Sequence, residues 1–269
     1  YQTYIVLSTV KNTRYCVFSI DKHFLICYTN HAINDEKKAS LMNIQGFLKL
    51  TLLDYPQKTA CTVFTGGCNL RCPFCHNASL VKNPTEQENK TDEVLDYLKK
   101  RTGILDGVCI TGGEPLLQPD LKDFIKAVKE LGFLVKLDTN GTLPKRLKEV
   151  IGLVDYVAMD IKASFDNYPN ATYCDIDRSV YEESINIIKN SGIDHEFRTT
   201  CVKGIHTIKD FTQIGELLKG EKKYFIQGFV DSGNLLESGQ AFSKDEMLEF
   251  LNEIKKYIPE AELRGEDKR

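Results

Sequence analysis

Three cysteines in one short run are the residues best suited to chemistry. Cys68, Cys72 and Cys75 are separated by three and then two residues, and they follow Gly66 and Gly67 directly. Thiolates at this spacing can hold an iron–sulfur cluster from a single loop, and glycines let the backbone approach it closely. A four-iron cluster normally has four cysteine ligands. Because only three lie close together, one iron would remain open to another ligand.

A structural zinc ion is the alternative use of this run, with His76 as the fourth ligand. Zinc accepts three cysteines and a histidine, but closed sites usually draw paired ligands from two separated segments. Four ligands packed between Cys68 and His76 would be an unusual zinc geometry. The spacing therefore favours an iron–sulfur cluster and leaves zinc open.

The remaining six cysteines carry no predicted chemistry. Three lie in apolar runs, where a thiol behaves as a small core residue: Cys61, Cys109 and Cys201. Three stay unassigned: Cys16, Cys27 and Cys174.

Short β-prone runs alternate with helical patterns from Met42 onward. The predicted strands are 60–65, 107–111, 134–138, 154–161, 196–202 and 224–230. The predicted helices are 91–102, 121–131, a shorter one after Pro144, 178–190, 208–219 and 244–258. Six alternations predict parallel strands joined by right-handed crossovers, in an open doubly wound sheet or a partial barrel. In both architectures ligands bind at the carboxyl ends of the strands, and the cysteine run follows the first strand.

The composition is that of an ordinary globular protein and excludes several classes. Of 269 residues, 42% are hydrophobic and 27% are charged, with a net charge of −3 and no basic stripe for nucleic acid. No apolar run approaches the ~18 residues that cross a bilayer, and no secretion signal opens the chain. The cysteine count of nine is odd, and the tight cluster of three is more typical of a metal site in a reducing compartment than of disulfides. We therefore expect a cytoplasmic protein without nucleic-acid or membrane partners.

Residues 1–41 differ from the rest of the chain. The segment opens with Tyr1 and mixes short apolar runs without helical periodicity. It is either a small β-rich extension or non-native sequence upstream of a natural start at Met42, and we favour the second. Residues 42–269 are expected to form the core domain.

Two motifs together resemble the radical S-adenosylmethionine (SAM) superfamily. The first is the cysteine run with Phe74 before its third cysteine, and the second is Thr111–Gly112–Gly113–Glu114–Pro115 after the second strand. Alone, Gly112 and Gly113 would indicate only a tight turn. The resemblance covers nearly all of 42–258 and implies a partial (β/α)6 barrel of the TIM type.

Further motifs resemble the activating proteins of anaerobic ribonucleoside-triphosphate reductase, in their longer form, and related glycyl-radical-enzyme activases. They are Gly46–Phe47–Leu48, Asp54–Tyr55–Pro56, Cys75–His76–Asn77, Asp138–Thr139–Asn140–Gly141 and Met159–Asp160–Ile161–Lys162. No cysteine lies between Cys75 and Cys109, so the ferredoxin-like insert of some activases is missing. Val202–Ile205 matches the family's fifth-strand motif only weakly, which leaves the adenine contact unassigned.

The resemblance implies roles for single residues. Cys68, Cys72 and Cys75 would hold a [4Fe–4S] cluster, whose open iron binds SAM. Glu114 would accept hydrogen bonds from the amino group of SAM, and Asp138 and Asn140 would contact the ribose, unless they form only an Asx turn with Gly141. Arg198, inside a strand, would pair with a ligand carboxylate or with another barrel residue. The full predicted cofactor-binding set is Phe74, Thr111, Gly112, Gly113, Glu114, Asp138, Asn140 and Arg198.

The implied activity is reductive cleavage of SAM to a 5′-deoxyadenosyl radical, which makes a glycyl radical on the large subunit of the reductase. A flavodoxin-like protein or a ferredoxin would supply the electron, and no catalytic residue beyond the cluster ligands is expected. His76 and Asn77 would shape the surroundings of the cluster, and Asp160 and Lys162 would form an ion pair lining the pocket. Two alternatives remain from the sequence: a radical SAM enzyme for a small molecule, such as a deazapurine synthase, and a non-catalytic zinc-binding module.

Overall fold

The computed structural model describes residues 14–18, 25–29, 42–82, 90–231 and 233–265. The chain divides into two compact units, Tyr1–Ser40 and Leu41–Arg269. In the first, β1 (Arg14–Phe18) and β2 (Leu25–Thr29) form an antiparallel pair. Whether residues 1–41 are native remains a prediction.

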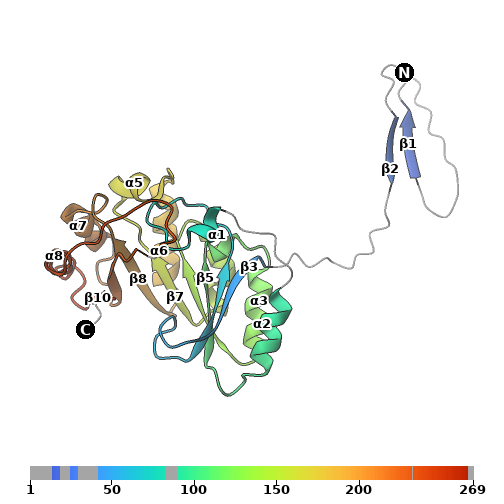
Figure 1. The fold of residues 1–269 in the computed structure, drawn as a ribbon, viewed down its shortest axis with the longest axis horizontal. Coiled ribbons are helices and arrows are strands. Elements are labelled where there is room, and N and C mark those ends of the chain that lie inside the picture. The colour runs from blue at the N-terminus through green and yellow to red at the C-terminus, as the bar shows by residue number, and fades with distance from the viewer. Residues whose placement is uncertain (1–13, 19–24, 30–41, 83–89, 232, 266–269) are drawn as a thin grey trace. The chain divides into compact units, whose positions relative to one another are not determined.

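The second unit is built on one eight-stranded sheet, in the order β10-β9-β8-β7-β6-β5-β4-β3 (Figure 1). Strands β4 to β9 run parallel to one another, which confirms the parallel sheet predicted from the six alternations. The parallel strands lie in chain order without the reversal of a doubly wound sheet, and within the described residues β3 and β10 are its two edges, as in a partial barrel. The parallel strands are β4 (Ala60–Thr65), β5 (Gly107–Gly112), β6 (Leu134–Thr139), β7 (Tyr156–Asp160), β8 (Asp194–Cys201) and β9 (Tyr224–Gly228).

The two end strands were not among the predicted strands. β3 (Ile44–Thr51) pairs antiparallel with β4, and its register shifts twice. Its leucines Leu48 and Leu50 are exposed, so it lacks the alternation that marks a half-buried strand. β10 (Glu262–Arg264) pairs with β9 over only three residues, which is too short for a periodic pattern.

All six predicted helices are present, with ends that differ from the prediction by a few residues. Strong local signals explain several of them: Thr207 and Ser243 form capping boxes, and Gly132 follows the third helix with a φ of +87°. Two short helices and three 3-10 turns were not predicted. The helices are α1 (Ala78–Lys82), α2 (Lys90–Lys99), α3 (Leu121–Glu130), α4 (Pro144–Val150), α5 (Tyr168–Thr172), α6 (Arg178–Lys189), α7 (Ile208–Leu217) and α8 (Lys244–Ile254), and the 3-10 turns are Pro115–Leu117, Ile151–Leu153 and Phe165–Asn167.

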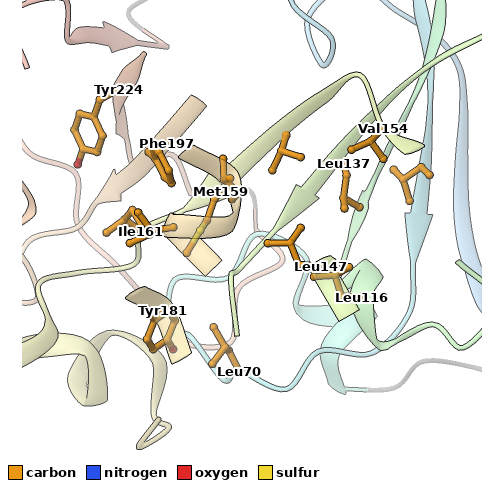
Figure 2. Close-up of a cluster of buried hydrophobic side chains, with 14 of the residues drawn as sticks. Leu70, Leu116, Leu137, Leu147, Val154, Met159, Ile161, Tyr181, Phe197 and Tyr224 are labelled. Carbon is orange, nitrogen blue, oxygen red and sulfur yellow. The ribbon is translucent and has the colours of Figure 1, made fainter. Parts of the chain in front are cut away.

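A continuous hydrophobic core joins the sheet to the helices. It extends from Tyr224 and Phe197 on β9 and β8, past Met159, to Leu147 of α4 and Leu116 (Figure 2). Cys61, Cys109 and Cys201 are each fully buried, which confirms their prediction as core residues. In the part of the chain that the structure describes, no helix has both the length and the apolar character to cross a membrane.

Candidate active site

The cysteine loop lies at the carboxyl end of β4 and lines a cavity of about 340 Å3. Cys72 is buried, and Cys68 and Cys75 are half-buried. The turn is closed by the N–H of Cys75, which donates to the carbonyl of Cys72 at 3.1 Å. Phe74 is buried beside it and meets the His206 ring edge-on, with 6.0 Å between centroids. The structure thus brings all three predicted ligands to one cavity.

The thiols of this loop are held in a polar but water-poor setting. Burial raises the pKa of Cys68, and it raises the pKa of Cys72 to about 12. The Lys162 ammonium opposes both shifts, because a nearby positive charge favours the thiolate. Lys162 therefore supplies the positive charge that bound thiolates need.

Gly112 and Gly113 bring the end of β5 against the start of the cysteine loop. A Cβ on Gly113 would lie 1.9 Å from the carbonyl oxygen of Gly67, and one on Gly112, whose φ is +113°, would lie 2.4 Å from the backbone nitrogen of Thr65. The N–H of Gly113 donates to Thr65 and that of Glu114 to Gly67, both at 2.8 Å. Only glycines allow this backbone contact, so the motif fixes where the cysteine loop begins.

Glu114 is fully buried and does not border the cavity. Its Oε1 accepts from the N–H of Leu116 at 3.0 Å and from the Thr139 hydroxyl at 2.9 Å, and its Oε2 accepts from the N–H of Asn140 at 2.7 Å. Burial raises the pKa of Glu114 to about 7, although these three donors oppose the shift. In this structure Glu114 joins β5 to β6, and its contact with the amino group of SAM stays a prediction.

Asn140, at the end of β6, borders the cavity with both amide atoms already bonded. Its Oδ1 accepts from the N–H of Thr142 at 3.0 Å, which is an Asx turn, and Gly141 between them has a φ of +75°. Its Nδ2 donates to Asn69 Oδ1 at 3.1 Å and to Cys68 Sγ at 3.7 Å. The local turn anticipated from the sequence is therefore present, and the ribose contact stays a prediction.

Arg198 joins two strand-end carboxylates across the cavity. Its Nε donates to Asp160 Oδ1 at 2.5 Å, and its Nη2 donates to Asp138 Oδ2 at 3.1 Å. Asp138 also pairs with Lys136, and Asp160 pairs with Lys162 at 3.0 Å. The structure thus shows the barrel ion pair for Arg198, and it confirms the Asp160–Lys162 pair lining the pocket.

Thr111, His76 and Asn77 also border the cavity. The Thr111 carbonyl accepts from the Thr65 hydroxyl at 3.1 Å, and Asn77 Nδ2 donates to the Gly112 carbonyl at 3.2 Å. His76 lies beside Phe229, with 5.5 Å between ring centroids. Asn77 therefore ties the end of the cysteine loop to the glycine motif.

Several residues of the cavity were not predicted. Thr200 of β8 and Gln227 of β9 line it, and Asn69 and Thr142 bond to each other and to Asn140, which lines it. Single polar residues such as these give no sequence signal. Lys136 is different, because a lysine inside an apolar strand needs a buried partner and could have been found on that ground.

The donor set fits an iron–sulfur cluster. Three thiols of one loop, a neighbouring ammonium and a close glycine backbone suit a group that thiolates bind. Among the described residues, no three His, Cys, Asp or Glu side chains are grouped to hold a metal ion. A cluster takes each thiolate on a different iron, so its three ligands need not converge on one point.

The partial barrel and its thiol-lined cavity define the class of protein. The model of the Radical SAM superfamily matches residues 62–218, and the chain belongs to this superfamily. It is therefore a radical SAM enzyme, of a family that uses a [4Fe–4S] cluster and SAM.

Two relatives of this chain carry the names of enzymes that activate glycyl-radical enzymes. A Methanocaldococcus jannaschii protein, MJ1227, that is assigned by name to the glycyl-radical enzyme activating enzymes is 33% identical over 82% of this chain and 95% of its own length. The pyruvate formate-lyase-activating enzyme of Clostridium pasteurianum is 37% identical over 37% of this chain and 44% of its own. The chain is thus homologous to glycyl-radical enzyme activating enzymes.

A solved structure shows the same fold at low sequence identity. A radical SAM methyltransferase from Sphaerobacter thermophilus superimposes with a TM-score of 0.59 at 13% identity, over 97% of this chain and 76% of that one. This likeness bears on the fold alone, and it confirms the radical SAM architecture.

Proposed function

We propose that this enzyme generates a glycyl radical on anaerobic ribonucleoside-triphosphate reductase. The observation that carries the proposal is the 33% identity to MJ1227, which extends over 95% of that protein. The motifs at Gly46–Leu48 and Asp54–Pro56, which resemble the reductase activases, support the large subunit of the reductase as the partner.

Residues that line the cavity would bind the cluster, offset its charge and position the cysteine loop. Cys68, Cys72 and Cys75 would hold the [4Fe–4S] cluster, and Lys162 would offset their charge. When bound, the cluster and SAM supply the reductive cleavage that yields a 5′-deoxyadenosyl radical. Gly112 and Gly113 hold the cysteine loop in place through backbone contacts.

The remaining predicted residues would bind and orient SAM at the mouth of the cavity. The charged groups of Asp138, Asp160 and Arg198 are already paired with one another, so they are preorganised before a ligand enters. Phe74 and Thr111 would help to exclude water from the reacting atoms. The rest of the predicted set would contact SAM: Gly112, Gly113, Glu114, Asp138, Asn140 and Arg198. A flavodoxin-like protein or a ferredoxin would reduce the cluster, and the need for low-potential chemistry supports a reducing, cytoplasmic setting.

A glycyl-radical measurement tests the proposal. The reconstituted enzyme is incubated anaerobically with dithionite, SAM and the large subunit of an anaerobic reductase, and the mixture is examined by electron paramagnetic resonance. We expect a glycyl doublet that requires SAM and disappears when the radical-bearing glycine of the reductase is replaced by alanine. SAM cleavage without a doublet would contradict the assignment of the partner.

A second candidate function has its own observation. The 7-carboxy-7-deazaguanine synthase of Methanopyrus kandleri is 29% identical over 53% of this chain and 66% of its own length. A small-molecule radical SAM reaction would then use the same cavity. Incubation with the reductase and, separately, with a precursor of 7-carboxy-7-deazaguanine distinguishes the two, because only the true substrate is converted to its product.

A further inference from the structure

A closed set of hydrogen bonds joins the end of β6 to the cysteine loop. Asn69 Nδ2 donates to the Thr142 hydroxyl at 2.7 Å, that hydroxyl donates to Asn140 Oδ1 at 2.6 Å, and Asn140 Nδ2 donates back to Asn69 Oδ1 at 3.1 Å. Asn140 and Thr142 are 5% and 7% exposed, so water competes little for these groups. We call these three hydrogen bonds the ring. Asn69 is the neighbour of Cys68 in sequence, so the ring lies beside a predicted cluster ligand.

The ring fixes which end of the Asn140 amide faces the sulfur. Oδ1 is held by two donors from Thr142, the N–H and the hydroxyl. The amide nitrogen must therefore point the other way, where it lies 3.7 Å from Cys68 Sγ. A flipped amide would place its oxygen against Asn69 Oδ1 and the sulfur, two acceptors, and would lose both bonds from Thr142.

The backbone supports the same orientation. The N–H of Asn140 donates to the buried carboxylate of Glu114 at 2.7 Å, which fixes the residue to the end of β5. The N–H of Leu70 donates to Cys68 Sγ at 3.4 Å. Cys68 thus has one backbone donor and one side-chain donor, and only the second depends on residue type.

A hydrogen bond to a ligand sulfur changes the electronics of an iron–sulfur cluster. The donor stabilises negative charge on the sulfur, and this charge is greater in the reduced cluster, so the bond raises the reduction potential. The effect is stronger in a buried site, where the effective dielectric constant is low. We propose that Asn140 is a positioning residue that donates to the Cys68 thiolate and raises the reduction potential of the cluster, with Thr142 and Asn69 orienting its amide.

This inference rests on the superfamily's cluster and not on the identity of the partner enzyme. It is tested without a reductase, so its failure and the failure of the proposed function are separate results. The nearly isosteric, uncharged variant Asn140→Leu removes the donor without adding charge. Thr142→Val removes the hydroxyl that donates to Asn140 Oδ1 and accepts from Asn69 Nδ2, so only the backbone N–H of residue 142 still orients the Asn140 amide, whereas Thr142→Ser keeps the hydroxyl.

The experiment is a redox titration of each reconstituted variant, in the absence of SAM, followed by electron paramagnetic resonance of the reduced cluster. We expect Asn140→Leu to lower the equilibrium constant for reduction about tenfold, which is about 59 mV for a one-electron couple. Thr142→Val should shift it in the same direction, and Thr142→Ser should match the wild type. Asn170→Leu, the same substitution at an exposed residue of α5 outside the cavity, is the matched control and should leave the potential unchanged.

A second readout separates tuning of the cluster from a purely structural role. Resonance Raman spectra should show a shifted iron–thiolate band in Asn140→Leu but not in Thr142→Ser. If Asn140→Leu takes up no cluster, the two Thr142 variants are compared instead. Equal reduction potentials in Thr142→Val and Thr142→Ser would overturn the proposal. An unchanged potential in Asn140→Leu, together with weakened SAM binding, also overturns it and assigns Asn140 to the ribose instead.

Discussion

The two ends of the barrel hold two cavities that differ in size and in construction. The cavity at the carboxyl ends of the strands measures about 340 Å3, and the one at the amino ends measures about 830 Å3. The larger is lined by charged residues such as Lys222, Lys255 and Glu260, which are exposed. The smaller combines three thiols, glycine backbone and buried ion pairs. Volume alone would have pointed to the wrong end.

The two ends also differ in the contacts that hold their side chains and loops in place. At the amino end, Arg264 pairs with the buried Glu196 at 2.6 and 2.9 Å. At the carboxyl end, Gly113 allows backbone contact with Gly67, and Arg198 holds two carboxylates. Close backbone approach and buried, paired charge therefore distinguish the reacting end from the other.

Removing a cluster ligand should give the largest difference between the two ends. We expect Cys72→Ala to lose cluster binding and SAM cleavage to background, because the loop would keep only two thiols. Iron content and 5′-deoxyadenosine production measure this. The matched control is Cys201→Ala, a buried core thiol that should keep both; full 5′-deoxyadenosine production by Cys72→Ala would refute the site.

Disturbing the backbone contact between Gly113 and Gly67 should have the next largest effect on cluster binding. In Gly113→Ala the new Cβ would lie 1.9 Å from the Gly67 carbonyl oxygen, so the cysteine loop must shift. We expect a loss of about 1–3 kcal/mol in unfolding free energy and at least roughly tenfold less bound iron. Gly152→Ala, with no atom within 4 Å of its new Cβ, should change neither. Equal iron content in the two variants would contradict the proposed role of the motif.

The buried carboxyl of Glu114 should make stability depend on pH. Its pKa of about 7 lies above the ordinary 4.5, so the folded state keeps a proton that the unfolded state has released. Stability that is present at low pH is then lost as the pH rises from about 4.5 to 7, by roughly 3 kcal/mol. Urea unfolding of the cluster-free protein at pH 5 and pH 8 measures it. The loss should be absent in Glu114→Gln and present in Glu260→Gln, and parallel profiles for all three proteins would contradict it.

Removing the Arg264–Glu196 ion pair at the amino end should have the smallest effect on the activity of the site. Arg264→Leu leaves Glu196 buried with the Tyr156 hydroxyl, 2.8 Å away, as its remaining donor. Because the arginine is partly exposed, we expect a loss of roughly 2 kcal/mol in unfolding free energy. Cluster content and SAM cleavage should be unchanged. A loss of SAM cleavage in the folded, cluster-loaded variant would show that the two ends are coupled.

Much of the fold was predictable because its signals are local and repeated. The six parallel strands follow from apolar runs that alternate with periodic helices, and β4 begins and ends as predicted. β10 was out of reach, since three residues carry no period and depend on pairing with β9. β3 was missed because its leucines Leu48 and Leu50 are exposed, so the strand lacks the alternation of buried apolar and exposed polar residues that predicts a strand.

The site was predictable to the extent that its residue types are unusual. Three close cysteines and a glycine pair stand out in any sequence, and the structure places them together. The partners of Asn140 do not stand out, since Asn69 and Thr142 are common residues that lie 71 and 2 positions away. Glu114 shows the limit most clearly: its position follows from the motif, but its burial and its three donors require the folded chain.

The chain of ion pairs inside the barrel makes the reacting cavity a dead end. Glu196 at the amino end lies 3.9 Å from Arg198, which is bound to Asp160, so charged side chains fill the passage between the two ends. Access from the amino end is therefore blocked, and a reacting group would have to enter at the carboxyl ends of the strands, where the cysteine loop lies. A protein substrate would have to thread its reacting residue inward on a projecting tip, and it would block the exit of the spent nucleoside until it withdrew.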